Sequence, residues 1–235
     1  MLTIGRQEYI GINAFESLDT NFVYANIKKP YHKYLFFEKI QSGYDYLIKH
    51  VDLRDINIVH ATTVFSDGAI ALRLNKLYGI PYIVAVRTSD LTGFLAKAPH
   101  TWPIGIEVLK RSSAIVFISE SLRRKFVKHI ALRPFVKELE HKFVLQPNGI
   151  DESWLENIVK QKRENNNNLC YIGRFDKIKN VPRVVDAVIQ LRDTIPGVHM
   201  DIVGGGGCDL EKIKGMIDHY PNPFHYHLYM LYQVG

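Results

Sequence analysis

The segment 171–180 has the features of an anion-binding turn. It reads Tyr-Ile-Gly-Arg-Phe-Asp-Lys-Ile-Lys-Asn and follows a short apolar stretch that we expect to be a strand. Gly173 permits a sharp turn, and Arg174 offers a forked hydrogen-bond donor. Lys177 and Lys179 add compact positive charges, and a helix beginning near the end of the segment would add unpaired backbone N–H groups. The segment suits a diphosphate, although an ordinary solvated basic turn has the same composition.

Two other turns carry glycines that would let the backbone approach a ligand closely. A run of four glycines starts with Gly204 and Gly205, between an expected strand and an expected helix. A Pro-Asn-Gly-Ile-Asp turn contains Asn148 and Gly149 and follows another strand. As binding elements, these four residues would line a nucleotide cleft between two domains. Common strand-to-helix and Asn-Gly turns are the alternative explanation.

Three polar residues are candidates for catalysis because of their place on expected strands. His60 ends one strand, and Arg87 and Asp90 follow the next one. In open α/β sheets, ligands bind outside the carboxyl ends of the strands, which is where these residues fall. The alternative for His60 is a hydrogen-bonded structural histidine.

Other catalytic chemistries have no support in the sequence. His225 and His227 alternate as in a strand, but two histidines without a third ligand make a poor zinc site, so we predict no metal. There is no phosphate-binding P-loop and no Gly-x-Ser-x-Gly elbow. Cys170 and Cys208 have neither metal-type nor disulfide-framework spacing, which indicates reduced thiols in a cytoplasmic protein.

The composition is that of a globular protein with anionic partners. The 235 residues are 46% hydrophobic and carry a formal charge of +6. The basic segment 123–128 suits either peripheral contact with an anionic membrane or a solvated helix face. No RNA-binding motif or DNA recognition helix is evident, so we expect no nucleic acid. No apolar run approaches the ~20 residues of a membrane span, and no secretory signal is evident. We therefore expect a cytoplasmic protein, with attachment to the inner face of the plasma membrane left open.

The elements that position these residues alternate regularly from residue 56 onward. We expect strands over 56–61, 81–86, 114–118, 143–146, 169–172 and 198–203, and another from 224. Amphipathic helices are expected over 34–50, from Ser66 to Gly79, after Pro103, from Glu120 behind a Ser119 cap, from about 180, and over 210–217. This alternation predicts α/β architecture with parallel sheets covered on both faces. The polar stretch 157–168 predicts a linker between domains at 1–150 and 151–235.

Together, these motifs resemble the retaining glycosyltransferases of family 4, which have the GT-B fold. The matching segments, in the family's order, are Val59–Ala61, Gly79–Val84, Ile118–Glu120, Pro147–Asp151, Gly173–Arg174 with Lys179–Asn180, and Ile202–Gly206. The segment 85–90 further resembles a bacterial subgroup that acts in surface-polysaccharide synthesis. The resemblance implies two Rossmann-like domains facing a cleft, an acceptor-side domain followed by a nucleotide-sugar-binding one.

The resemblance also implies a reaction. A UDP- or GDP-sugar would donate its sugar to a glycan or lipid-linked acceptor, with retention of configuration and without a cofactor or metal. Arg174 and Lys179, with Gly173, would hold the donor diphosphate and stabilise its departure. Arg87 stands where the family usually has a histidine, and it cannot act as a base because it stays protonated.

Two family elements are missing from the sequence. Residues 1–55 show neither the family's first strand nor its glycine-rich loop, and no paired-glutamate motif follows the glycine run. We therefore expect a chain truncated at both ends, with an incomplete second domain and impaired transfer. The alternatives are a non-catalytic remnant that binds a nucleotide or a partner, and a nucleotide-sugar epimerase-like enzyme.

Overall fold

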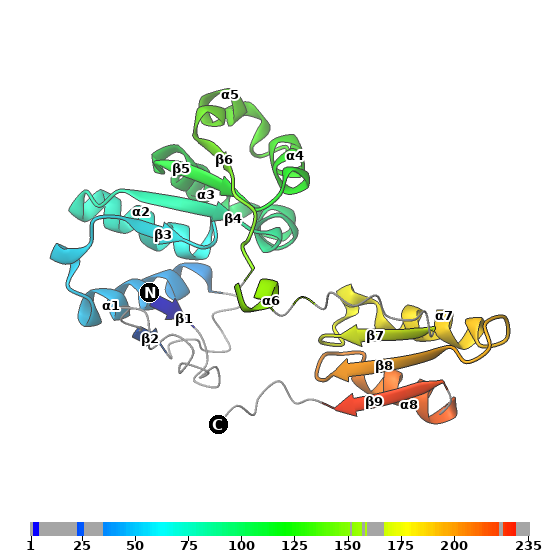
Figure 1. Ribbon diagram of the computed structural model, residues 1–235. Coiled ribbons are helices and arrows are strands. Elements are labelled where there is room, and N and C mark those ends of the chain that lie inside the picture. The colour runs from blue at the N-terminus through cyan, green and yellow to red at the C-terminus, as the bar shows by residue number, and fades with distance from the viewer. Residues whose placement is uncertain are drawn as a thin grey trace. The chain divides into compact units, whose positions relative to one another are not determined.

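The chain folds into two compact units, each built on its own parallel sheet (Figure 1). The computed structural model describes residues 2–4, 23–25, 35–150, 152–156, 158, 167–220 and 223–228. Among these, the division between units falls between Glu152 and Ser153. This is the α/β architecture with parallel sheets that the alternating pattern predicts.

The first unit holds a four-stranded sheet in the order β3-β4-β5-β6. Its strands are β3 (Val59–Ala61), β4 (Tyr82–Val86), β5 (Ala114–Phe117) and β6 (Phe143–Leu145). Its helices are α1 (Phe36–His50), α2 (Ser66–Tyr78), the π-helix η4 (Asp90–Leu95), α3 (Trp102–Arg111), α4 (Glu120–Lys128) and α5 (Val136–Leu139). Short 3-10 turns lie at Leu53–Asp55, Pro99–Thr101, Arg133–Phe135 and Glu140–Lys142. The helix α6 (Glu152–Glu156) spans the division between the units.

The core of this unit forms where strand residues meet the apolar faces of the helices. Val84, Ile115 and Phe117 are fully buried, and Leu74 of α2 packs into the same cluster. Burying a side chain of this size contributes about 1.5–3 kcal/mol. The central strands of the sheet are therefore a rigid base for the loops that follow them.

Several helix ends agree with the sequence, and one cap does not. α2 ends at Gly79, which has the left-handed φ of 71°, and Ser119 caps α4 by accepting the N–H of Leu122 at 3.2 Å. The sequence offers Ser66 and Asp67 as caps for the start of α2, but in the structure it is the Thr63 hydroxyl that accepts a helix N–H, that of Asp67. Leu77 has the spacing to share one apolar face of α2 with Ile70 and Leu74, but it is 59% exposed, because it lies in the last turn of that helix.

A short parallel pair of strands lies in the N-terminal part of the chain. β1 (Leu2–Ile4) pairs with β2 (Val23–Ala25). The residue pattern at 22–25 is compatible with a strand, and β2 lies there, whereas no pattern in the sequence predicted β1. Three residues are too few to show a strand period in the sequence.

The second unit holds the sheet β7-β8-β9, again parallel. Its elements are β7 (Asn168–Ile172), the 3-10 turn η8 (Lys177–Lys179), α7 (Val181–Leu191), β8 (His199–Gly204), α8 (Leu210–His219) and β9 (Phe224–Leu228). α7 and α8 pack on one face of the sheet, where Met200 and Ile202 are buried (Figure 1). Among the described elements no helix covers the opposite face, unlike the two-sided cover expected from the sequence.

Two expected segments can be compared only in part. Most of the polar linker 157–168 lies outside the described residues, and its last residue, Asn168, is the first residue of β7. α7 starts as expected. Of the valines that its spacing predicts to face inward, Val185 and Val188 are buried, but Val184 is 37% exposed.

Candidate functional site

Arg87 links the carboxyl ends of three segments in the first unit. It follows β4, and its Nε donates to the carbonyl oxygen of Thr62, just after β3, at 3.3 Å. Its Nη1 donates to Oδ1 of Asn148, beyond the end of β6, also at 3.3 Å. Two of the residues expected at a cleft are therefore in direct contact, although 61 positions separate them in sequence.

Asp90 is fully buried beneath this group. Its two carboxylate oxygens accept backbone N–H groups, from Val64 at 3.1 Å and from Arg87 at 2.8 Å. Burial raises the pKa of Asp90 to about 6, although these N–H donors act in the opposite direction. With no exposed surface, the carboxylate is placed to hold the loop that carries Arg87. It is not placed to touch a substrate directly.

The sequence reading missed a neighbouring polar pair. The Thr62 hydroxyl donates to the Asp67 carboxylate, and Asp67 also lies close enough to Asp90 to raise its pKa further. The sequence does contain a signal for this pair: two threonines follow a strand, and an aspartate lies in the first turn of the next helix. Both residues lie at the same polar edge as Arg87.

The other residues predicted for this edge make fewer contacts with it. His60 lies inside β3, not at its end, and its side chain is exposed. No hydrogen bond or ion pair joins it to Arg87, Asp90 or Asn148 within the described part of the chain. Gly149 is exposed, and a Cβ placed on it would meet nothing within 4 Å.

In the second unit, the two glycine turns predicted separately form one structure. Gly204 has a φ of 152°, and a Cβ on it would lie only 1.9 Å from the carbonyl oxygen of Gly173. A Cβ on Gly207 would lie 2.4 Å from the backbone of Phe175, whose ring is fully buried. The N–H of Phe175 donates to the carbonyl of Gly206 at 3.2 Å. The turn after β7 is therefore held against the glycine run after β8, which begins with Gly204 and Gly205.

The cations of this unit are exposed beside the glycine turns. Arg174 pairs with Asp176 through Nε to Oδ2 at 3.0 Å and Nη2 to Oδ1 at 3.4 Å. This contact, with a smaller effect of Lys179, lowers the pKa of Asp176. Lys177 and Lys179 lie exposed on η8, directly before α7. Gly173, Arg174 and Lys179 thus lie on one loop, but a carboxylate holds the guanidinium in this structure.

Comparison with known proteins gives the family. The model of Glycosyltransferase Family 4 matches residues 11–154, which is more than half of the chain. The chain belongs to Glycosyltransferase Family 4. A stretch of 124 residues is 30% identical to an uncharacterized glycosyltransferase of Methanocaldococcus jannaschii, MJ1069. That match covers 51% of this chain and 30% of the relative, so the chain spans less than a third of that relative.

Solved structures share the fold at low sequence identity. TarM of S. aureus has a TM-score of 0.55 at 16% identity, over 81% of this chain and 36% of TarM. The catalytic domain of starch synthase IV from Arabidopsis thaliana has a TM-score of 0.56 at 14% identity, over 88% of this chain and 54% of that domain. UDP-GlcNAc 2-epimerase from Neisseria meningitidis has a TM-score of 0.54 at 13% identity, over 98% of this chain and 64% of the epimerase. The expected GT-B type of fold is thereby confirmed in part, over the portion of these proteins that the chain spans.

Proposed function

We propose that the second unit binds the diphosphate of a nucleotide-sugar donor at the loop of Gly173, Arg174 and Lys179. The observation that carries this proposal is the close packing of Gly204 against Gly173, which holds the cationic loop beside a glycine-rich turn. At Gly206 of this turn a Cβ would meet nothing within 4 Å, so an anion could approach the backbone there. The Arg174 fork and the Lys179 ammonium lie on the same loop, and the N-terminal end of α7 follows it.

The structural relatives support the choice of anion. TarM was solved in complex with UDP, and the epimerase was solved bound to UDP-GlcNAc. For the whole protein we propose retaining glycosyl transfer from a UDP- or GDP-sugar, because the chain belongs to a glycosyltransferase family. Positive charge at the diphosphate would stabilise the departing nucleotide.

For the first unit we propose an acceptor-side role for its polar edge. Arg87 and Asn148 would contact a phosphate or the acceptor, a glycan or a lipid-linked sugar. Asp90 would position Arg87 from below, since its oxygens bind the backbone of that loop. His60 is the remaining candidate for contact with substrate, and its exposure leaves it accessible.

Calorimetry with UDP and GDP tests the diphosphate site. Arg174→Ala should weaken nucleotide binding by roughly 1.5–3 kcal/mol, which is about 10- to 150-fold in Kd. Arg192→Ala is the matched control, because Arg192 lies in the same unit, is similarly exposed and also pairs with a neighbouring aspartate, Asp193. Equal affinities of wild type and Arg174→Ala would reject the role given to Arg174.

The reaction needs a separate assay, because the epimerase shares the fold over nearly the whole chain. Incubation with UDP- and GDP-sugars should yield epimer without acceptor if the protein is an epimerase, and glycosylated product only with acceptor if it is a transferase. We predict weak or undetectable transfer by these 235 residues, because only Glu211 follows the glycine run and no second glutamate completes a pair. Robust transfer would contradict that prediction.

Membrane contact is a further part of the proposal. No described helix combines the length and apolarity that a bilayer span requires. Within α4, Arg123 and Arg124 both pair with Glu120, which reduces the charge available to anionic lipid. We propose weak, salt-sensitive peripheral binding, to be measured by co-sedimentation with vesicles with and without anionic lipid.

A further inference from the structure

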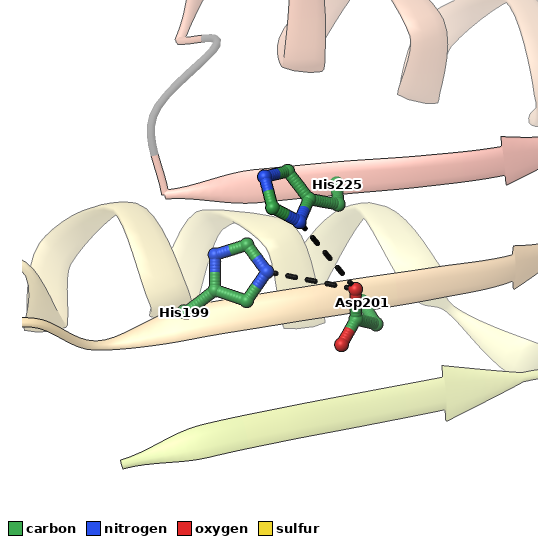
Figure 2. Close-up of side chains that lie close together, drawn as sticks. All are labelled: His199, Asp201 and His225. Carbon is green, nitrogen blue, oxygen red and sulfur yellow. Dashed lines mark ion pairs between the residues drawn. The ribbon is translucent and has the colours of Figure 1, made fainter. Parts of the chain in front are cut away.

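Three side chains with metal-binding atoms gather on the second sheet. His199 and Asp201 belong to β8, and His225 belongs to β9. Nε2 of His199 lies 3.5 Å from Oδ1 of Asp201, and Nδ1 of His225 lies 3.8 Å from the same oxygen. Figure 2 shows both imidazole rings turned toward the Asp201 carboxylate. One ligand atom from each residue lies within 4.8 Å of the others.

The topology of the sheet brings these residues together. His199 and Asp201 are two positions apart on β8, so their side chains leave the same face. Asp201 is the direct register partner of His225 on the parallel strand β9, which places His225 on that face as well. The helices α7 and α8 pack on the other face, against Met200 and Ile202, so no described helix covers the cluster. The cluster is therefore preformed by backbone pairing, and it is open to solvent at the exposed His225 side chain.

One ring nitrogen of the cluster lacks a hydrogen-bond partner. Nε2 of His199 is buried and has no hydrogen-bond partner among the described residues. A buried polar atom left unpaired costs about 1–3 kcal/mol, and such atoms in native proteins usually have a partner or a bound ion. A metal ion between the rings would give this nitrogen a partner, and the Asp201 carboxylate would balance its charge.

We propose that His199, Asp201 and His225 bind a divalent transition metal of the zinc type. Two imidazoles and one carboxylate are ligands that zinc accepts, and they leave one of four tetrahedral positions open. Bonds of about 2.0–2.2 Å in a tetrahedron set neighbouring ligand atoms about 3.3–3.5 Å apart. The distances from Asp201 to His199 and His225 are at or a few tenths of an ångström above that range, and the ligand atoms of the two histidines lie within 4.8 Å of each other, so binding needs side-chain rotations that bring the two rings closer.

The site lies away from the proposed diphosphate loop. His199 begins β8, whereas the glycine turn follows the other end of that strand at Gly204. A metal here would cross-link β8 and β9 and stabilise the sheet, without contact with the donor phosphates. Metal binding and nucleotide binding can therefore fail independently, and Arg174→Ala should leave metal affinity unchanged.

Calorimetric titration of the full chain with Zn²⁺ and Co²⁺ tests the proposal. The wild-type chain is titrated beside a parent protein for all variants that carries Cys170→Ser and Cys208→Ser, because both cysteines are exposed, thiols bind these metals, and Cys170 is the register partner of Asp201 on β7. We expect one Zn²⁺ per chain, and a Co²⁺ complex with the visible absorption of a four-coordinate site. His225→Gln and Asp201→Asn should each weaken binding by at least the roughly 10- to 100-fold that follows loss of an outer-shell partner. Mg²⁺ should bind far more weakly, because it prefers oxygen ligands.

The control is His219→Ala, which removes an exposed histidine of the same unit at the end of α8. It should bind Zn²⁺ as tightly as the parent protein. Zn²⁺ should also raise the melting temperature of the parent and the control but not that of His225→Gln. Asp201→Asn, which preserves side-chain size, provides a second test if His225→Gln fails to fold. Absence of Zn²⁺ binding by the parent, or equal binding by the parent and both site variants, would overturn the proposal.

Discussion

Gly204 lies so close to Gly173 that a Cβ on Gly204 would come within 1.9 Å of the Gly173 carbonyl oxygen. The contact joins the turn after β7 to the turn after β8. A backbone carbonyl cannot move aside without breaking the turn, so position 204 accepts no side chain.

Gly204→Ala should therefore destabilise the second unit by at least about 3 kcal/mol and abolish nucleotide binding. Hydrogen exchange of the β8 amides measures the stability of this unit by itself. Gly215→Ala is the matched control, because a Cβ on that α8 residue meets nothing within 4 Å. We expect the control to gain about 0.5–1 kcal/mol, because glycine in the middle of a helix is less stable than alanine by about that amount. Equal exchange rates in the two variants would contradict this account.

Ionisation of Asp90 should destabilise the first unit. Burial raises its pKa to about 6, so between about pH 4 and 6 the folded chain holds a proton that the unfolded chain releases. The stability contributed by Asp90 is complete below that range, falls as pH rises through it, and is constant above. Asp90→Asn cannot ionise. The free energy of unfolding of the wild type minus that of Asp90→Asn should fall by on the order of 3 kcal/mol between pH 4 and 7.

Urea unfolding of both proteins across this pH range provides the difference. NMR titration of the Asp90 carboxyl carbon provides a direct check, with an expected midpoint near 6. Suppose instead that the difference in unfolding free energy does not change with pH and that the NMR midpoint lies at the ordinary aspartate pKa. Burial would then not control the pKa of Asp90.

The hydrogen bond between Arg87 and Asn148 should appear as an energetic coupling. A double-mutant cycle of Arg87→Ala and Asn148→Ala should give a coupling of about 0.5–1.5 kcal/mol in unfolding free energy. A cycle of Asn148→Ala with Arg73→Ala should give none, because Arg73 instead contacts Gln41 and the ring of Tyr44. Coupling of similar size in both cycles would mean that the contact at 3.3 Å has no specific energetic role.

Asp176 should compete with the donor diphosphate for Arg174. Asp176→Asn removes the carboxylate that pairs with the guanidinium and leaves the loop one unit more positive. We expect nucleotide binding to tighten by about 2- to 5-fold, a gain of roughly 0.5–1 kcal/mol, measured by calorimetry at low salt. Asp193→Asn, beside Arg192, is the corresponding control and should change nothing. Weaker binding by Asp176→Asn would indicate that Asp176 orients Arg174 for the ligand.

Local features of the sequence predicted local features of the structure. The Gly79 end of α2, the Ser119 cap of α4 and the start of α7 near Asn180 all depend on residues within one helical turn. The alternation of apolar strands and amphipathic helices predicted α/β units with parallel sheets for the same reason, since burial periodicity is a property of neighbouring residues. The family motifs were also short, contiguous segments.

Contacts between strands could not be predicted from the sequence in this way. The sequence places His225 near His227 and finds no third ligand, whereas the sheet register places it beside Asp201 and His199. The burial of Asp90 and the contact of Arg87 with Asn148 likewise depend on which strand ends lie side by side. The sequence by itself determined the elements and the chemistry that each loop carries. Only the tertiary structure decided which of those loops and side chains meet, because strand register and packing are set by residues far apart along the chain.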